Sequence, residues 1–264
     1  MAGETTPELR LERDGGIAYL VLDNPARLNA LTSAMWAALP RLLSQAEADA
    51  AMRVIVLKGA GGKAFSAGAD ISEFESARTG DAVKAYDALN HAAFEALLAA
   101  GKPTVAMIEG FCLGGGLGIA ACCDLRIANE AASFAIPAAK LGLGYHPRWV
   151  RTLLTLAPPA SVKEMLFTGR RFSAAEALSM GLVNRVHPAE QLSAETRSLA
   201  ETIAGNAPMT IRAAKEAIDE LTAKPETADI GRLEQLVKQC FDSADYAEGR
   251  KAFAEKRKPE FKGR

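Results

Sequence analysis

The residues that could do chemistry in this chain gather in two short glycine-rich segments. The first reads KAFSAGADI, from Lys63 to Ile71, and the second reads FCLGGGLGIAACCD, from Phe111 to Asp124. In each, small residues stand where a β-strand is expected to end and a helix to begin. Such junctions expose backbone N–H groups that can donate to an anion or to a polarised carbonyl oxygen. Two converging donors would form an oxyanion hole, the device that stabilises developing charge in acyl chemistry.

The second segment also fits a different binding pattern. Gly116 to Ala121, GLGIAA, matches the G-x-G-x-x-A fingerprint of dinucleotide-binding proteins. That fingerprint requires an acidic residue about 20 positions further on, at the end of the next strand. Residues 134–142 read FAIPAAKLG and contain none. The fingerprint is also expected early in its domain, so a nicotinamide-dependent enzyme is the disfavoured alternative.

Taken together, the two segments resemble those of the crotonase family, also called the enoyl-CoA hydratase/isomerase family. The resemblance runs from NPARLNAL, which begins at Asn24, to FAEKRKPEF near the end of the chain. It implies that the N–H groups of Ala69 and Gly115 are the two oxyanion donors. Hydratases of the family also carry two catalytic glutamates, and the matching positions here hold Gly118 and Ala138. We therefore expect an oxyanion hole without the usual acid–base pair.

Polar groups for the acyl carbon could come instead from the loop PAAKLGLGYH, which begins at Pro137. In the family, methylmalonyl-CoA decarboxylase has a tyrosine at the position of Tyr145. Dienoyl-CoA isomerases and chlorobenzoyl-CoA dehalogenase have an aspartate close to the position of His146. A histidine is a competent acid or base near neutral pH. We predict that Tyr145 and His146 face the acyl carbon and take part in catalysis; the alternative is that they only line or cap the loop.

Other polar residues near these segments are interpreted as structural or peripheral. His91 lies off the apolar stripe of its helix and is expected on a solvated face, and His187 is expected in an exposed loop. Asp124 matches a structural aspartate of the family at a helix–strand junction. Glu73 and Glu75 follow AGADI in a variable stretch that lines the acyl pocket in relatives, and they are weaker catalytic candidates.

The resemblance also implies a site for the coenzyme A part of the substrate. AGAD lines its adenine and pantetheine side, and Arg27 lies near the phosphates. Phe253 and Lys256 pack on the adenine ring and the phosphates, often across a subunit boundary. The residues assigned to the substrate and CoA site are Arg27, Leu28, Ala67, Gly68, Asp70, Ile71, Gly114, Pro137, Ala138, Phe253 and Lys256.

Composition limits the other classes of function. The net charge of −1 gives no bias towards nucleic acid or membranes. The four cysteines have no metal-ligand spacing, so we expect no metal site and reduced thiols, as in a cytoplasmic protein. The first residues, MAGETTPELRLERDGG, have no apolar signal core. No stretch of about 18 apolar residues suggests a membrane span.

The pattern of elements indicates an α/β fold. Buried strands are predicted at residues 17–22, 54–57 and 104–108, an amphipathic helix at 81–100, and helices from residue 193 onward. Thr32 is expected to cap a helix in which Pro40 causes a kink or a late start. The resemblance implies a crotonase-like spiral of ββα units over residues 1–192 and a C-terminal helical subdomain over 193–264. It also implies a homotrimer or a dimer of trimers.

The leading functional hypothesis is an acyl-CoA thioester enzyme of this family, a lyase or isomerase whose hydratase activity is doubtful. Its oxyanion hole would stabilise an enolate-like thioester oxygen, with no cofactor besides the coenzyme A of the substrate. Two alternatives remain open: a non-catalytic acyl-CoA binding protein, or a decarboxylase-like member that uses Tyr145 and His146. Acyl chain length, reaction type and pathway are not specified by the sequence.

Overall fold

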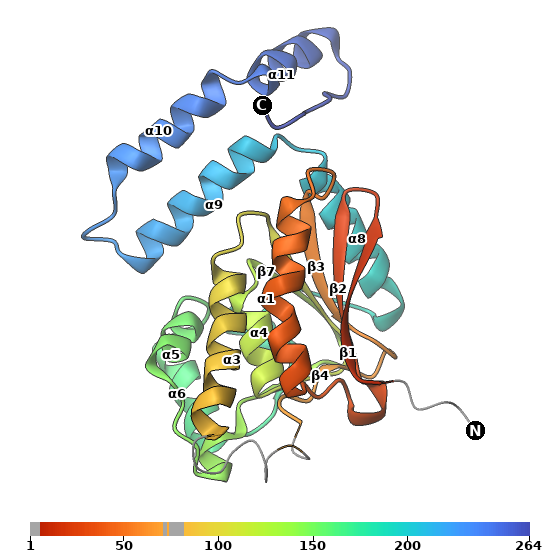
Figure 1. Cartoon of the computed structure of the whole chain (residues 1–264), viewed down its shortest axis with the longest axis vertical. Coiled ribbons are helices and arrows are strands. Elements are labelled where there is room, and N and C mark those ends of the chain that lie inside the picture. The colour runs from red at the N-terminus through yellow and green to blue at the C-terminus, as the bar shows by residue number, and fades with distance from the viewer. Residues whose placement is uncertain (1–5, 71–72, 74–81) are drawn as a thin grey trace.

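The computed structural model describes residues 6–70, 73 and 82–264, and it contains two β-sheets (Figure 1). Five strands of the larger sheet run parallel, and only its first strand is antiparallel. The order of the larger sheet is β1 (Glu8–Asp14), β2 (Ile17–Asp23), β3 (Val54–Gly59), β5 (Thr104–Ile108), β7 (Leu125–Asn129) and β10 (Arg185–His187). The order of the smaller sheet is β4 (Ala64–Ser66), β6 (Phe111–Leu113), β8 (Ser133–Ala135) and β9 (Phe172–Ser173).

The chain moves between the two sheets in a regular sequence. β3, β4 and helix α3 (Ala82–Leu98) form one turn, and β5, β6 and helix α4 (Gly115–Cys122) form the next. β7 and β8 then lead into the short helix η3 (Pro137–Leu141) and helix α5 (Pro147–Leu154). This succession is a spiral of ββα units and confirms the predicted fold. The apolar runs at β3 and β5 reflect burial on both faces of a parallel sheet.

Helices cover both faces of the larger sheet. Helix α1 (Ser33–Ala48) lies beside α3 on one face, and α8 (Ala189–Ala204) covers the other (Figure 1). The Thr32 hydroxyl accepts a hydrogen bond from the N–H of Met35, which confirms the predicted cap. The helix nevertheless begins at Ser33 and continues through Pro40, so the expected late start is wrong. Leu39 and Leu42, on either side of Pro40, are buried in the core, so this part of the helix packs like the rest.

Along the chain, helix α6 (Pro159–Thr168) lies between β8 and β9, and helix α7 (Ala174–Ser179) connects β9 to β10. Beyond α8, three helices form an arm that stands at one end of the molecule: α9 (Pro208–Ala223), α10 (Ile230–Phe241) and α11 (Ala244–Glu255) (Figure 1). Because α8 packs on the sheet through Leu192 and Ala200, the chain leaves the sheet after α8. The division at residue 192 stays a prediction. None of the helices in the described residues has the length and apolarity that a membrane crossing requires.

A half-buried lysine of α9 joins the arm to the core. Lys215 on α9 donates to Oδ2 of Asp124 at 2.8 Å and to the carbonyl of Lys102 at 3.1 Å. The same carboxylate oxygen accepts from the N–H of Thr104 at 2.7 Å and from its hydroxyl at 3.0 Å. Asp124 therefore ties the starts of β5 and β7 to α9, in agreement with the structural role predicted for it.

The end of the chain folds back onto α11. Asp245, which is buried, accepts hydrogen bonds from the N–H groups of Lys262 and Gly263, both at 2.7 Å. Glu248 accepts from the N–H of Glu260 at 3.0 Å and pairs with Arg257 at 2.6 Å. These two carboxylates hold the last residues in a fixed position.

Candidate active site

Two of the motif segments are joined by backbone hydrogen bonds. The N–H of Leu31 donates to the carbonyl of Gly68 at 2.7 Å, and the N–H of Asp70 donates to the carbonyl of Leu31 at 2.9 Å. Nearer the start of the loop, the N–H of Ala67 donates to the carbonyl of Leu28 at 2.9 Å. NPARLNAL and AGAD thus pair like two short parallel strands.

A buried asparagine fixes the shape of the first of these loops. Asn29 has a φ of 55°, a backbone conformation that asparagine tolerates better than most residues. Its side-chain amide donates to the carbonyls of Ala60 at 2.9 Å and Ala64 at 2.7 Å. Its carbonyl oxygen accepts from the N–H of Asn24 at 3.0 Å. These contacts hold the loop that carries Arg27 against β4.

The second glycine-rich segment lies directly against the first. Gly68 has a φ of 98°, and a Cβ added to it would lie 2.9 Å from the carbonyl of Leu113 and 3.4 Å from the nitrogen of Gly115. A Cβ on Gly115 would lie 3.9 Å from the nitrogen of Ala69. Both glycines therefore allow an approach of the two backbones that a larger side chain would prevent.

The N–H groups of Ala69 and Gly115 are brought close together by this approach. Gly115 is the first residue of α4, where N–H groups have no acceptor within the helix and the helix dipole favours negative charge. Within the described part of the chain, neither of these two N–H groups donates a backbone hydrogen bond. Chemically, the pair can bind an oxygen atom that carries negative charge.

An aromatic cluster packs against α4 at Gly115 and Gly118. A Cβ on Gly118 would lie 2.6 Å from Cζ of Phe94, and one on Gly115 would lie 2.9 Å from Cζ2 of Trp36. Phe94 meets Trp36 edge to face at a centroid distance of 5.4 Å, and it meets Trp149 in the same way at 4.6 Å. Sequence reasoning missed this cluster, because Trp36, Phe94 and Trp149 lie on three helices whose packing no local pattern specifies.

His146 is exposed and caps α5, where its Nδ1 accepts from the N–H of Arg148 at 3.2 Å. Its ring meets that of His91 edge to face at 4.5 Å. His91 is half-buried and also lies 5.0 Å from the Trp149 ring, so the expectation of a solvated face is wrong. The side chain packs there because α3 and α5 bring the two imidazoles to the edge of the aromatic cluster.

Tyr145 is half-buried against the hydrophobic core. Burial raises the pKa of its phenol well above the usual value of 10.0, so the group stays protonated and can donate a hydrogen bond. The predicted placement of Tyr145 and His146 over the acyl carbon stays a prediction.

The other predicted binding residues divide between two parts of the molecule. The guanidinium of Arg27 pairs with Asp70 at 2.9 Å beside the paired loops, and Gly114 caps α4. Pro137 and Ala138 begin η3, with Ala138 half-buried against the core. Ile71 lies outside the described residues. Phe253 and Lys256 are exposed at the end of α11, and Figure 1 shows that helix at the opposite end of the molecule from β4.

Two other sequence interpretations have structural outcomes. Glu73 accepts hydrogen bonds from the N–H of Ser33 at 2.8 Å and from its hydroxyl at 2.7 Å, so it stabilises the first turn of α1. Glu75 lies outside the described residues. His187 ends β10 and is half-buried, so its predicted exposure in a loop is wrong; the strand pairs there with β7. Among the described residues, no group of three or more metal-ligating side chains is placed to hold a metal ion.

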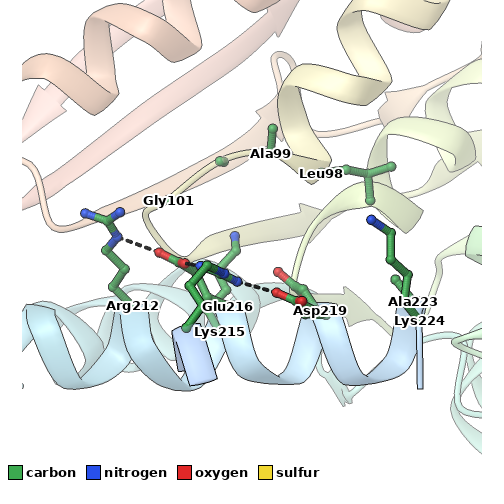
Figure 2. A pocket seen from close by; sticks show the side chains of 12 residues that line it. Leu98, Ala99, Gly101, Arg212, Lys215, Glu216, Asp219, Ala223 and Lys224 are labelled. Atoms are coloured by element: carbon green, nitrogen blue, oxygen red, sulfur yellow. Dashed lines mark hydrogen bonds and ion pairs between the residues drawn. The ribbon is translucent and has the colours of Figure 1, made fainter. Parts of the chain in front are cut away.

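A separate cleft of about 460 Å³ lies between the end of α3 and α9 (Figure 2). Figure 2 shows Arg212, Lys215, Glu216 and Asp219 along α9 on this side. Arg212 pairs with Glu216 at 2.7 Å, and Lys215 is the residue that anchors the arm to Asp124. The cleft therefore belongs to the attachment of the arm rather than to the paired loops.

Comparison with known proteins agrees with this architecture. The family described as Enoyl-CoA hydratase/isomerase matches residues 12–264. A short-chain-enoyl-CoA hydratase of Clostridium acetobutylicum is 36% identical over 258 residues, which cover 96% of this chain and 97% of the relative. A carnitinyl-CoA dehydratase of Proteus mirabilis is 37% identical over 262 residues, which cover 97% and 98%.

Solved structures show the same similarity in three dimensions. An enoyl-CoA hydratase/isomerase family protein of Hyphomonas neptunium has a TM-score of 0.93 and 39% identity, with 99% of each chain covered. An enoyl-CoA hydratase/carnithine racemase of Magnetospirillum magneticum has a TM-score of 0.91 and 36% identity, with 98% of this chain and 97% of the other covered. On the strength of its sequence and its fold, this chain belongs to the enoyl-CoA hydratase/isomerase family.

Proposed function

We propose that this protein is an enzyme of acyl-CoA thioesters that stabilises an enolate-like thioester oxygen with the N–H groups of Ala69 and Gly115. The observation that carries the proposal is the contact between the two glycine-rich segments. A Cβ on Gly115 would lie only 3.9 Å from the nitrogen of Ala69, and both donors lack another backbone acceptor in the described chain. Preorganised donors of this kind contribute about 3–4 kcal/mol each to transition-state stabilisation.

The named relatives act on CoA thioesters, which supports the same substrate class for this chain. Hydration is not part of the proposal, because Gly118 and Ala138 offer no carboxylate to hold and activate a water molecule. An isomerisation or a decarboxylation requires the hole and needs a less elaborate acid–base pair. In either reaction, Tyr145 and His146 are the residues that we propose to handle the proton.

The coenzyme A part of the substrate would extend past Arg27. Phe253 lies on α11 and Lys256 caps it, and Figure 1 shows that helix at the opposite end of the molecule from β4, so the two residues would serve the site of a neighbouring subunit. A groove of about 760 Å³ on the arm supports subunit contacts, since it is lined largely by apolar side chains that include Val237, Phe241 and Phe253. The groove supports an assembly, and the family resemblance supplies the stoichiometry that we propose, a homotrimer or a dimer of trimers.

The experiment that tests the proposal is a panel of acyl-CoA thioesters assayed for binding by isothermal titration calorimetry and for turnover. Gly115→Ala would push Trp36 and disturb the donor, so it should reduce turnover by about 10²-fold or more. Gly231→Ala, in α10, is the matched control, because a Cβ there would make only an ordinary contact of 3.6 Å with Oδ1 of Asp229. Absence of any CoA or acyl-CoA binding at millimolar concentration would refute the substrate class. Binding without turnover would favour a non-catalytic acyl-CoA binding protein.

A further inference from the structure

The phenyl ring of Phe94 fills the space in which a side chain at position 118 would begin. A Cβ added to Gly118 would lie 2.6 Å from Cζ, 3.0 Å from Cε1 and 3.5 Å from Cε2 of that ring. Real Cβ atoms do not approach carbon atoms as closely as the first of these distances. Position 118 and the Phe94 ring therefore exclude one another: the space holds the ring or a side chain, but not both.

Phe94 is held so that it cannot easily move aside. It is 5% exposed, and edge-to-face contacts with Trp36 and Trp149 enclose it on two sides. Trp36 is itself fixed, since its Nε1–H donates to the hydroxyl of Tyr86 at 3.1 Å. A side-chain rotation of Phe94 would have to displace one of two buried tryptophans, which close packing makes costly.

One of these rings, that of Trp36, reaches the oxyanion donor Gly115. Trp36 touches Gly115, and Gly118 follows Gly115 by three residues on α4, which is a distance of roughly 5 Å along the helix axis. Carbon edges of aromatic rings offer almost no hydrogen bonds. A water molecule needs about two to four polar partners to be held in place. The side of the hole that faces Gly118 is therefore a poor place for an ordered water.

We propose that Phe94 keeps reactive water away from the Gly118 side of the hole, and so restricts the site to thioester reactions in which water is not a reactant. The inference rests on the proposed function, and it adds to it a residue that determines which reactions are possible. It also predicts that glutamates at positions 118 and 138 would not by themselves turn this site into a hydratase. A glutamate at position 118 would compete with Phe94 for space and would be forced out of position.

The first test measures hydration of crotonyl-CoA by two multiple variants. G118E/A138E supplies both carboxylates and keeps the ring, whereas F94A/G118E/A138E also removes the ring. Since a positioned acid or base typically contributes about 10²- to 10⁴-fold, the triple variant should hydrate at least about tenfold faster than the double variant. Equal rates in the two variants, or a wild-type rate as high as that of the triple variant, would overturn the inference.

The second test needs no activity and remains decisive if a multiple variant folds poorly. Gly→Ala in a helix interior normally stabilises a protein. G118A should instead lower the midpoint of thermal unfolding in the wild-type background and raise it in the F94A background. G231A, in the open first turn of α10, should not lower the midpoint in either background. If G118A has the same effect with and without Phe94, the contact does not constrain position 118 and the inference is wrong.

Calorimetric titration with CoA and crotonyl-CoA distinguishes a failure of the proposed function from a failure of the inference about Phe94. If the wild type binds neither, the proposed function itself is refuted, whatever the stability measurements give. If the wild type and both multiple variants bind CoA equally and the triple variant gains no hydration, only the role of Phe94 is refuted.

Discussion

The guanidinium of Arg27 lies 2.9 Å from the carboxylate of Asp70, a residue 43 positions later in the chain. Asp70 is 5% exposed, whereas the Arg27 side chain is 53% exposed. The pair therefore connects a buried anion to the surface at the junction of the NPARLNAL and AGAD loops. It places one cation beside the paired loops that contain Ala69, where the phosphates of a CoA thioester are expected.

Arg27→Ala should destabilise this junction and weaken CoA binding together. Removing the arginine takes a charge-assisted partner from a buried carboxylate, which costs about 1–3 kcal/mol in comparable cases. Urea unfolding would measure the loss of stability, and calorimetry would measure CoA affinity. Arg185→Ala, at an exposed position on β10, is the control and should change stability by no more than about 0.5 kcal/mol. Unchanged stability of the Arg27 variant would show that the pair is only a surface contact.

Lys256→Ala should weaken CoA binding more at low salt than at high salt. Lys256 is exposed at the end of α11, and salt screens contacts between an exposed ammonium and a phosphate. A loss of roughly fivefold is expected at low ionic strength, since one exposed charge contact contributes about 1 kcal/mol. Lys163→Ala removes the same charge from the exposed face of α6 and should leave affinity unaltered. Equal losses for the two variants would mean that only net charge matters.

Tyr145→Phe or His146→Ala should reduce turnover of the true substrate at least about tenfold while CoA binding is retained. His146 also caps α5, so a lower rate in the alanine variant could come from a disturbed helix. His146→Asn distinguishes the two roles, because asparagine is a good N-cap residue without proton-transfer chemistry at neutral pH. A rate fully restored in the asparagine variant would identify His146 as a cap and not as a catalytic residue.

The fold-back of the chain end should depend on pH in the acid range. Hydrogen bonds from Arg257 and from the N–H of Glu260 lower the pKa of Glu248 from 4.5 to about 2. A depressed pKa means that the contribution of the carboxylate is complete above pH 4.5 and is lost as the pH falls towards 2. Titration of the Glu248 carboxyl by NMR should give a midpoint near 2, and Glu248→Gln should remove the transition. A midpoint near 4.5 would mean that the end of the chain is not held by this residue in solution.

The long elements of the fold follow from local pattern. β2, β3 and β5 have apolar runs that are buried along most of their length, and they lie where the sequence predicts strands. β1 was missed because charged side chains dominate it and only Leu9 is buried. β4 and β6 have three residues each, which is too few for any periodicity to appear. The spiral was identified through the family resemblance, and the structure confirms it.

In the candidate site, too, features set by the local sequence could be predicted, whereas contacts between distant elements could not. The glycines that let two backbones approach could be identified, because a strand–helix junction gives Gly68 and Gly115 a specific task. The contact between Phe94 and Gly118 could not, because it depends on how α3 packs against α4. A glycine inside a helix is a signal of such close packing, but it does not indicate which residue fills the space.

Asp124 links the arm to the end of α4, so the position of the arm can affect the orientation of that helix. Helix α4 starts at Gly115, one of the two proposed oxyanion donors, and ends at Cys122, two residues before the carboxylate that holds Lys215. Eight helical residues span about 12 Å. The helix is thus a short rigid connection between the proposed oxyanion donor Gly115 at one end and the attachment of the arm at the other. In the proposed oligomer, a tilt of the arm would be transmitted along this helix and would reorient the Gly115 N–H, although the arm itself lies at the other end of the molecule.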